Sequence, residues 1–254
     1  MFLHRLNPSI KALTIIITIF MLAFIFDPYT PLFFLLSTIL LTFVGGNISW
    51  KKYLLFFLPF TLFAFGMLWT TIMFAKGPEN PSEVVRLFGL QFSKESFQTA
   101  CALALRILSI AALSLLFIFT TNIIHFILSL MQQCKLSPKI AYGVLAGCRI
   151  LPMMKDELKV IHVAQRIRGV NQDRSLRGKW LQYKRLAIPL LASAIRKAER
   201  TAIAMESKGF TGSKNRTFYR TFHVSTTDWL LSLLIPALFV VSAFLSWRLG
   251  YFTW

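Results

Sequence analysis

Cysteine and acidic residues are both scarce in this chain. Its 254 residues include three cysteines, Cys101, Cys134 and Cys148, which are scattered and form no Cys-x-x-Cys pair. This pattern argues against a disulfide framework and against a zinc site. Asp and Glu number 10 against 28 Lys and Arg, which makes the formal net charge +18. Such a balance suits nucleic acid, anionic lipid, an acidic protein surface or the cytoplasmic loops of a membrane protein.

Features that would support catalysis or a bound cofactor are also missing. The four histidines have no metal-ligand spacing, and no paired carboxylates stand within an apolar stretch. Gly209–Lys214 is glycine-rich but lacks the spacing of a phosphate-binding loop, so the chain is not expected to hydrolyse ATP alone. Asp156 and Glu157 are adjacent, which puts them on different faces of a helix, and we interpret both as solvated charges. The sequence therefore predicts a non-enzyme with no metal and no cofactor of its own.

Long apolar runs, by contrast, are abundant. Hydrophobic residues make up 56% of the chain and Phe alone occupies 25 positions, while charged residues reach only 15%. A helix needs about 20 apolar residues to span the hydrocarbon of a bilayer. Five stretches approach that length, namely Ala12–Phe26, Leu32–Val44, Tyr53–Ala75, Phe97–Thr121 and Trp229–Leu249. These runs predict an all-α fold: a polytopic membrane helical bundle of about five spans with a cytoplasmic α-helical unit.

The distribution of Lys and Arg orients these predicted spans. Arg5 and Lys11 precede the first span, Lys51 and Lys52 follow the second, and the turn between those two spans carries no cation. Most of the remaining positive charge lies within residues 122–227. Because cytoplasmic loops collect Lys and Arg, we predict a cytoplasmic N-terminus and an outside C-terminus. The predicted domains are 1–121 with four spans, 122–227 as a basic cytoplasmic region with two amphipathic helices, and 228–254 as the last span.

Two amphipathic helices in the basic region have similar endings. The first is predicted to run from near Pro152 to Gly169, and the second from near Pro189 to Gly209. Forty positions apart, Val163–Val170 aligns with Ile203–Phe210, so that each helix ends on a cation followed by Gly and an apolar residue. A cation in the last turn and a Gly just after it are also what an ordinary helix cap requires. The pattern alone leaves open whether these endings are caps or paired functional devices.

These endings resemble a known family. The two short motifs Ile167–Gly169 and Ser207–Gly209 and the longer run Arg196–Phe210 are similar to the transmembrane T component of energy-coupling factor (ECF) transporters, vitamin and metal importers of prokaryotes. The opening Leu3–Pro8, followed by Lys11, also resembles the start of that family. The similarity extends over essentially the whole chain in layout and is specific only in these patches.

The resemblance implies a multi-pass protein of the bacterial plasma membrane with several partners. Two ATP-binding-cassette (ABC) ATPase subunits would bind the ATP, and a substrate-capture subunit, the S component, would dock on the apolar surface. The implied ATPase-coupling residues are Arg168, Gly169, Lys208 and Gly209, with Arg166, Glu206 and Arg149 as candidate supports. Vitamin uptake is the implied function, and thiamine or its pyrimidine precursor is our guess for the substrate, which no residue supports.

The chain departs from the Ala-Arg-Gly motif of that family in both copies. Lys208 replaces Arg in the second copy, which keeps the charge but loses the planar fork of donors. Ile167 and Ser207 replace Ala. The second anchor is therefore expected to be the weaker one, or to bind a different acceptor.

One further cation and two alternative functions complete the hypotheses. Arg106 lies inside the fourth predicted span, where a charge is costly, and it would contact the S component or pair with another span. A membrane enzyme acting on anionic lipid or polyprenyl phosphate is the main alternative, although such enzymes usually display an acidic metal-binding cluster. A membrane-anchored nucleic-acid binder is less favoured, because the amphipathic stripes suit packing on membrane or protein. We therefore predict a lipid bilayer and protein partners, but no nucleic acid.

Overall fold

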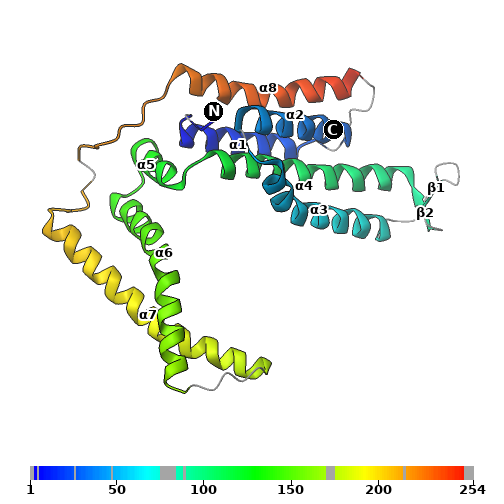
Figure 1. Cartoon of the computed structure of the whole chain (residues 1–254). Helices are drawn as coiled ribbons and strands as arrows, with labels where there is room; N and C mark the ends of the chain where they lie inside the picture. Colours follow the sequence, from blue (N-terminus) through cyan, green and yellow to red (C-terminus); the bar gives the residue numbers. More distant parts are fainter. Residues whose placement is uncertain are drawn as a thin grey trace. The chain divides into compact units, whose positions relative to one another are not determined.

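The computed structural model describes residues 3–4, 6–25, 27–46, 48–74, 84–87, 90–169, 175–213 and 216–248 (Figure 1). Its elements are α1 (Pro8–Ala23), α2 (Tyr29–Gly46), α3 (Trp50–Met73), β1 (Val84–Leu87), β2 (Leu90–Ser93), α4 (Lys94–Thr120), α5 (Ile123–Gln133), α6 (Pro138–Ile167), α7 (Leu176–Ser207) and α8 (Thr226–Arg248). The chain divides into two compact units. The bundle unit comprises Met1–Ser129 with Phe222–Trp254, and the arm unit comprises Leu130–Thr221.

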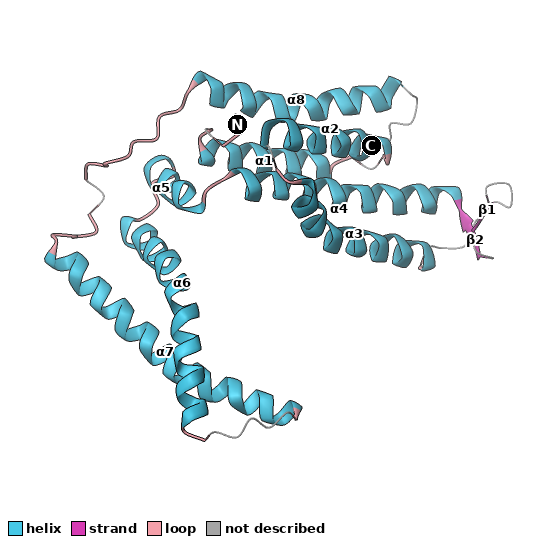
Figure 2. Cartoon of the chain, viewed as in Figure 1, coloured by secondary structure: helices cyan, strands magenta, loops and turns pink. Residues whose placement is uncertain are grey.

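Helix dominates the described chain, as Figure 2 shows, and four helices are long and apolar enough to cross a membrane. They are α2, α3, the part of α4 from Ser96 onward, and α8. The predicted helical membrane bundle is therefore confirmed. The first predicted span differs, because α1 has only 16 residues. At 1.5 Å per residue it measures about 24 Å, less than the roughly 30 Å of a bilayer core.

A short β-hairpin precedes α4 and was not predicted. Strands β1 and β2 pair antiparallel, with Val84 opposite Ser93 and Leu87 opposite Leu90. Four-residue strands leave almost no periodic signal in a sequence.

Helix α4 lies at the centre of the bundle unit, with α3 on one side and α1 and α2 on the other, while α8 covers α1 and α2 (Figure 1). Small buried side chains on α4, including Ala104, Ala111 and Ala112, let neighbouring helices approach closely. The core contains large apolar side chains from α1, α2, α4 and α8: Leu22, Phe34, Leu113, Leu116, Ile235 and Phe239. Most of α3 beyond its contact with α4 is exposed and apolar, as a lipid-facing surface requires.

Lys11 ties the N-terminal segment to the end of α4. The side chain is 2% exposed, and its ammonium donates to the Leu3 carbonyl at 2.6 Å, to the Thr120 hydroxyl at 3.0 Å and to the Thr120 carbonyl at 3.3 Å. The last carbonyls of a helix lack intrahelical donors and carry partial negative charge. Lys11 therefore satisfies the C-terminal end of α4, a role that a loop cation, as it was predicted to be, would not have.

The same N-terminal segment also contacts α5 and the start of α8. The backbone N–H of Asn7 donates to the buried Asp228 carboxylate at 2.8 Å, and Ser225 N–H donates to the other oxygen of that carboxylate at 2.8 Å. The hydroxyls of Ser9 and Ser129 are hydrogen-bonded at 2.7 Å. Residues on either side of the arm unit in sequence are thus bound by Asn7 and Ser9.

The arm unit is built on α6 and α7, which pack against each other and cross (Figure 1). Both helices begin earlier than predicted, because Pro152 and Pro189 lie inside them instead of at their first turns. Ile140–Leu151 belongs to the first part of α6 and is continuous with the rest of that helix. A proline removes one backbone hydrogen bond from a helix, and the turns on both sides keep their own bonds. The starting residue of α6 is another proline, Pro138, which suits the first helical turn.

Helix α5 was also missed by sequence reasoning. It begins after Asn122, whose side-chain oxygen accepts a hydrogen bond from the Ile124 N–H at 2.9 Å. Asn in this position is a common N-cap and was the signal available. The 11 residues of α5 are too few to span a membrane.

Candidate functional site

Helices α6 and α7 end in the same backbone conformation. Arg168 closes α6 with φ −73° and ψ 7°, and Gly169 follows with φ +71°. Lys208 closes α7 with φ −86° and ψ 10°, and Gly209 follows with φ +82°. Each cation, hereafter a motif cation, is the last residue before a left-handed glycine. The aligned endings of the sequence are therefore alike in three dimensions as well.

One backbone hydrogen bond, donated by the left-handed glycine, is common to both ends. At α7 the N–H of Gly209 donates to the Glu206 carbonyl at 2.9 Å, and the N–H of Phe210 donates to the Met205 carbonyl at 3.0 Å. This pair of bonds is a Schellman cap. At α6 the N–H of Gly169 donates to the Arg166 carbonyl at 3.1 Å. Arg166 and Glu206, the candidate supports, thus stand at equivalent positions, and each contributes its backbone carbonyl to a cap.

The motif cations are displayed on the surface. Arg168, Gly169, Lys208 and Gly209 are all exposed, and neither cation forms an ion pair with another described residue. A Cβ atom added to Gly169 or Gly209 would meet nothing within 4 Å. Glycine is therefore required at these positions for its positive φ and not for space. The interpretation of these endings as helix caps therefore agrees with their geometry. The caps also hold one cation at the tip of each helix.

Replacing either capping glycine by alanine is expected to loosen the end of its helix by about 1 kcal/mol, because alanine disfavours a positive φ. Hydrogen exchange of the last turn of α6 or α7 measures this fraying. Gly147→Ala is the matched control, since Gly147 is helical, has no neighbour near its missing Cβ and gains helix propensity from alanine. Equal protection in Gly169→Ala, Gly209→Ala and Gly147→Ala would contradict the cap assignment.

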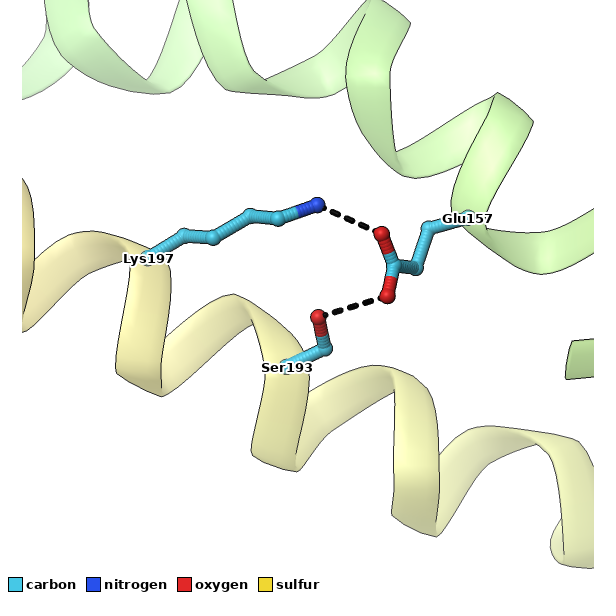
Figure 3. A network of polar contacts seen from close by, with 3 residues as sticks. All are labelled: Glu157, Ser193 and Lys197. Carbon is cyan, nitrogen blue, oxygen red and sulfur yellow. Dashed lines mark hydrogen bonds and ion pairs between the residues drawn. The ribbon is translucent and has the colours of Figure 1, made fainter. Parts of the chain in front are cut away.

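One polar contact joins the two helices where they cross (Figure 3). The Lys197 ammonium donates to Oε2 of Glu157 at 2.6 Å, and the Ser193 hydroxyl donates to Oε1 at 3.0 Å. Glu157 is not the solvated charge that the sequence suggested. That description fits Asp156, which is exposed and pairs with Lys159 on its own helix at 3.0 Å.

The contact lies at the same distance from both motif cations. Glu157 precedes Arg168 by eleven residues, and Lys197 precedes Lys208 by eleven residues. The two helices therefore cross at equivalent positions of their aligned endings, and those positions hold opposite charges. At 1.5 Å per residue, each motif cation lies about 17 Å along its helix from the crossing.

Partners of the Glu157 carboxylate lower its pKa. The hydrogen bond from Lys197 is the main cause and that from Ser193 the second, so the pKa lies below the ordinary 4.5. A carboxylate with a lowered pKa contributes stability that is present above its unfolded pKa and is lost as pH falls through the folded value. Protonation of Glu157 in acid is therefore expected to weaken the contact between α6 and α7.

Aromatic rings and Arg216 hold the segment after α7 against α6. The Arg216 guanidinium lies 4.7 Å from the centre of the Tyr142 ring and 5.6 Å from that of Phe210, within the range of a cation–π contact. The Tyr142 and Phe210 rings also meet edge to face at 5.4 Å. Between this contact and the crossing lies a cavity of about 510 Å³, lined by small residues such as Gly143, Gly147 and Ala202.

Many apolar side chains of α6 and α7 are exposed. On α6, Val160, Val163 and Ile167 are 66%, 54% and 81% exposed. On α7, Ile188 and Leu191 are 72% and 63% exposed. Exposed apolar stripes of this extent are typical of surfaces that bind another protein or a membrane.

The remaining site candidates lie elsewhere. Arg106 on α4 is half-buried and donates to the Ile25 carbonyl, just after α1, so it contacts the backbone between two helices of its own unit. Arg149 is exposed on α6, before the crossing. Among the described residues, no group of three or more His, Cys, Asp and Glu side chains is placed to hold a metal ion.

Comparisons with known proteins agree on one family. Residues 1–219 match the family model described as cobalt transport protein, CbiQ. The chain is 29% identical to a Streptococcus equi protein over 93% of this chain and 89% of the relative, and 30% identical to one from Bacillus selenitireducens over 89% and 85%. A Thermotoga maritima relative is 28% identical over 95% and 89%. All three relatives are named energy-coupling factor transporter transmembrane protein EcfT.

Proposed function

Because the chain belongs to the CbiQ family of cobalt transport proteins, we propose that it is the transmembrane energy-coupling component of an ECF importer. Its partners are two cytoplasmic ABC ATPases and a substrate-capture S component. The observation that carries this proposal is the pair of equivalent, exposed cations at the glycine-capped ends of two crossing helices. Arg168 and Lys208 each anchor one ATPase.

Rigid helices ending in a cation suit this task. A cap with a left-handed glycine stops the helix abruptly, so the cation is carried at the tip with little backbone freedom. Acidic or carbonyl-lined grooves on the ATPases would accept it, and the exposed apolar side chains near each tip add buried area. Movement of the ATPases is then transmitted along α6 and α7 to the membrane bundle.

The substrate and the orientation are parts of the same proposal. The S component docks on the apolar surface of the bundle unit and carries the vitamin, so substrate choice belongs to that partner, and thiamine or its precursor stays an unsupported guess. The basic arm unit lies in the cytoplasm with the N-terminus, and the C-terminus lies outside. The charge distribution along the sequence supports this orientation.

Co-purification in detergent tests the proposal. We expect the tagged chain, co-expressed with the ABC ATPases of its host, to recover both ATPase copies in a stable complex. Extracts that contain the ATPases and an unrelated tagged membrane protein of similar charge are the control. If the tagged chain recovers no more ATPase than this control while inserted normally in the membrane, the assignment of the two anchors is wrong.

A further inference from the structure

We propose that Glu157, Ser193 and Lys197 form a polar pivot that sets where α6 and α7 cross and thereby positions the two motif cations. The inference rests on the proposed function, since it assigns to these residues the spacing of the two ATPase anchors. None of the three residues belongs to the motifs themselves. They act through the geometry of the helices that carry Arg168 and Lys208.

The contact uses every acceptor oxygen of one carboxylate. Oε1 of Glu157 receives the Ser193 hydroxyl at 3.0 Å and Oε2 receives the Lys197 ammonium at 2.6 Å (Figure 3). Ser193 and Lys197 are four residues apart, so they lie one turn from each other on the same face of α7. A single side chain of α6 is thus held at two heights on α7. Such a bidentate contact resists sliding of one helix along the other.

The polar character of the contact permits rotation where apolar packing would resist it. The side chains of Lys197 and Glu157 are 29% and 33% exposed, so water can replace part of the interaction as the helices turn. Ion pairs of this exposure hold a position at little net stability. Interdigitated apolar side chains would instead favour one crossing angle, because close packing tolerates few arrangements. The pivot therefore maintains the crossing point while the angle between α6 and α7 changes.

The two motif cations are equally far from the crossing, which determines how the pivot affects their spacing. Each motif cation lies about 17 Å along its helix from the crossing, so a change of angle moves both tips by the same amount. Two anchors with a defined separation bind two joined ATPases with avidity, which exceeds single-site affinity by a factor on the order of 100 or more. Loss of the pivot leaves each anchor able to bind alone and removes this gain.

Charge exchange across the crossing tests the pivot on the full-length protein. Spin labels at Val163→Cys and Ile203→Cys, two exposed and equivalent positions, report the distance between α6 and α7 in a background where the three native cysteines are replaced. ATPase capture is measured on chains that carry neither these labels nor these two substitutions, because Val163 lies on the surface assigned to the ATPases. Glu157→Lys and Lys197→Glu are each expected to broaden the distance distribution and to weaken ATPase capture at least tenfold. The double exchange is expected to restore both readings.

A neighbouring ion pair supplies the matched control. Asp156→Lys and Lys159→Glu cause the same changes of charge one or two residues away, on an exposed pair that does not reach α7. We expect them to leave both readings unchanged. The pivot is overturned if Glu157→Lys behaves like Asp156→Lys, or if the double exchange fails to restore the distance distribution. Failure of the wild-type chain to capture ATPases, with the distance results as expected, would instead overturn the proposed function alone.

Discussion

Reversing both motif charges, Arg168→Glu together with Lys208→Glu, is expected to reduce ATPase recovery at least a hundredfold. Each substitution replaces an attraction by a repulsion at an interface, and like charges brought together there cost several kcal/mol. Every 1.4 kcal/mol is a factor of about ten in affinity, so two such changes remove measurable binding. Co-purification and a detergent-based binding assay at fixed salt measure the loss.

The two anchors are expected to contribute unequally. The Arg168 guanidinium can bind a carboxylate through two parallel hydrogen bonds, whereas the Lys208 ammonium acts as a point charge. Arg168→Glu alone should therefore weaken capture more than Lys208→Glu alone, and Lys208→Arg should strengthen it. Lys155→Glu with Arg200→Glu is the control for net charge, because these exposed cations lie on the same helices away from their ends. Equal losses of ATPase recovery in the control and in the double reversal would show that the motif cations have no role beyond helix capping.

Lys11→Met is expected to destabilise the bundle unit by on the order of 3 kcal/mol, since hydrogen bonds to a charged group contribute about 1.5–3 kcal/mol each. Methionine keeps the length of the side chain but removes every donor. The carbonyls of Leu3 and Thr120, which accept from the Lys11 ammonium at 2.6 and 3.3 Å, are then left without it in a buried site. Thermal unfolding in detergent, followed by size-exclusion chromatography, measures the change.

Lys52→Met is the control for Lys11→Met. Lys52 is exposed at the beginning of α3, and its loss removes the same charge from the same side of the predicted topology. We expect its unfolding temperature to stay close to that of the wild type. If Lys11→Met unfolded at the same temperature as Lys52→Met, the buried ammonium would have no structural role, and Lys11 would serve only the orientation of the first helix.

Sequence reasoning succeeded where the signal is local. A bilayer-spanning helix must be apolar along its whole length, so composition alone located α2, α3, α4 and α8. A left-handed residue after a helix is nearly always Gly, so Gly169 and Gly209 marked both helix ends. Pro152 and Pro189 were wrongly predicted to mark helix starts, because proline does not specify a single position in a helix. A proline is compatible both with a first turn and, at some cost, with the interior of a long helix, and the flanking residues decide which occurs.

Side-chain partners lay beyond the reach of that reasoning. Glu157 is adjacent to Asp156 and so lies on a different face of the helix, and on that basis both were interpreted as solvated charges. Its actual partners, Ser193 and Lys197, stand 36 and 40 residues away. Arg106 was expected to bind a partner or another span, and its hydrogen bond goes to the backbone carbonyl of Ile25. Contacts of this kind arise only when helices have been brought side by side.

The sequence by itself determined the membrane character, the positions of the four long spans, the two aligned helix ends and the family. Each of these depends on composition, on short-range periodicity or on a backbone conformation that few residue types other than glycine adopt. Tertiary structure alone decided that Lys11 is buried against the end of α4, that Asp228 binds the N-terminal segment and that Glu157 meets α7 at the equivalent position of the second arm. The physical reason is that a charged side chain is compatible with solvent or with a buried partner, and only the packing of distant segments selects between them.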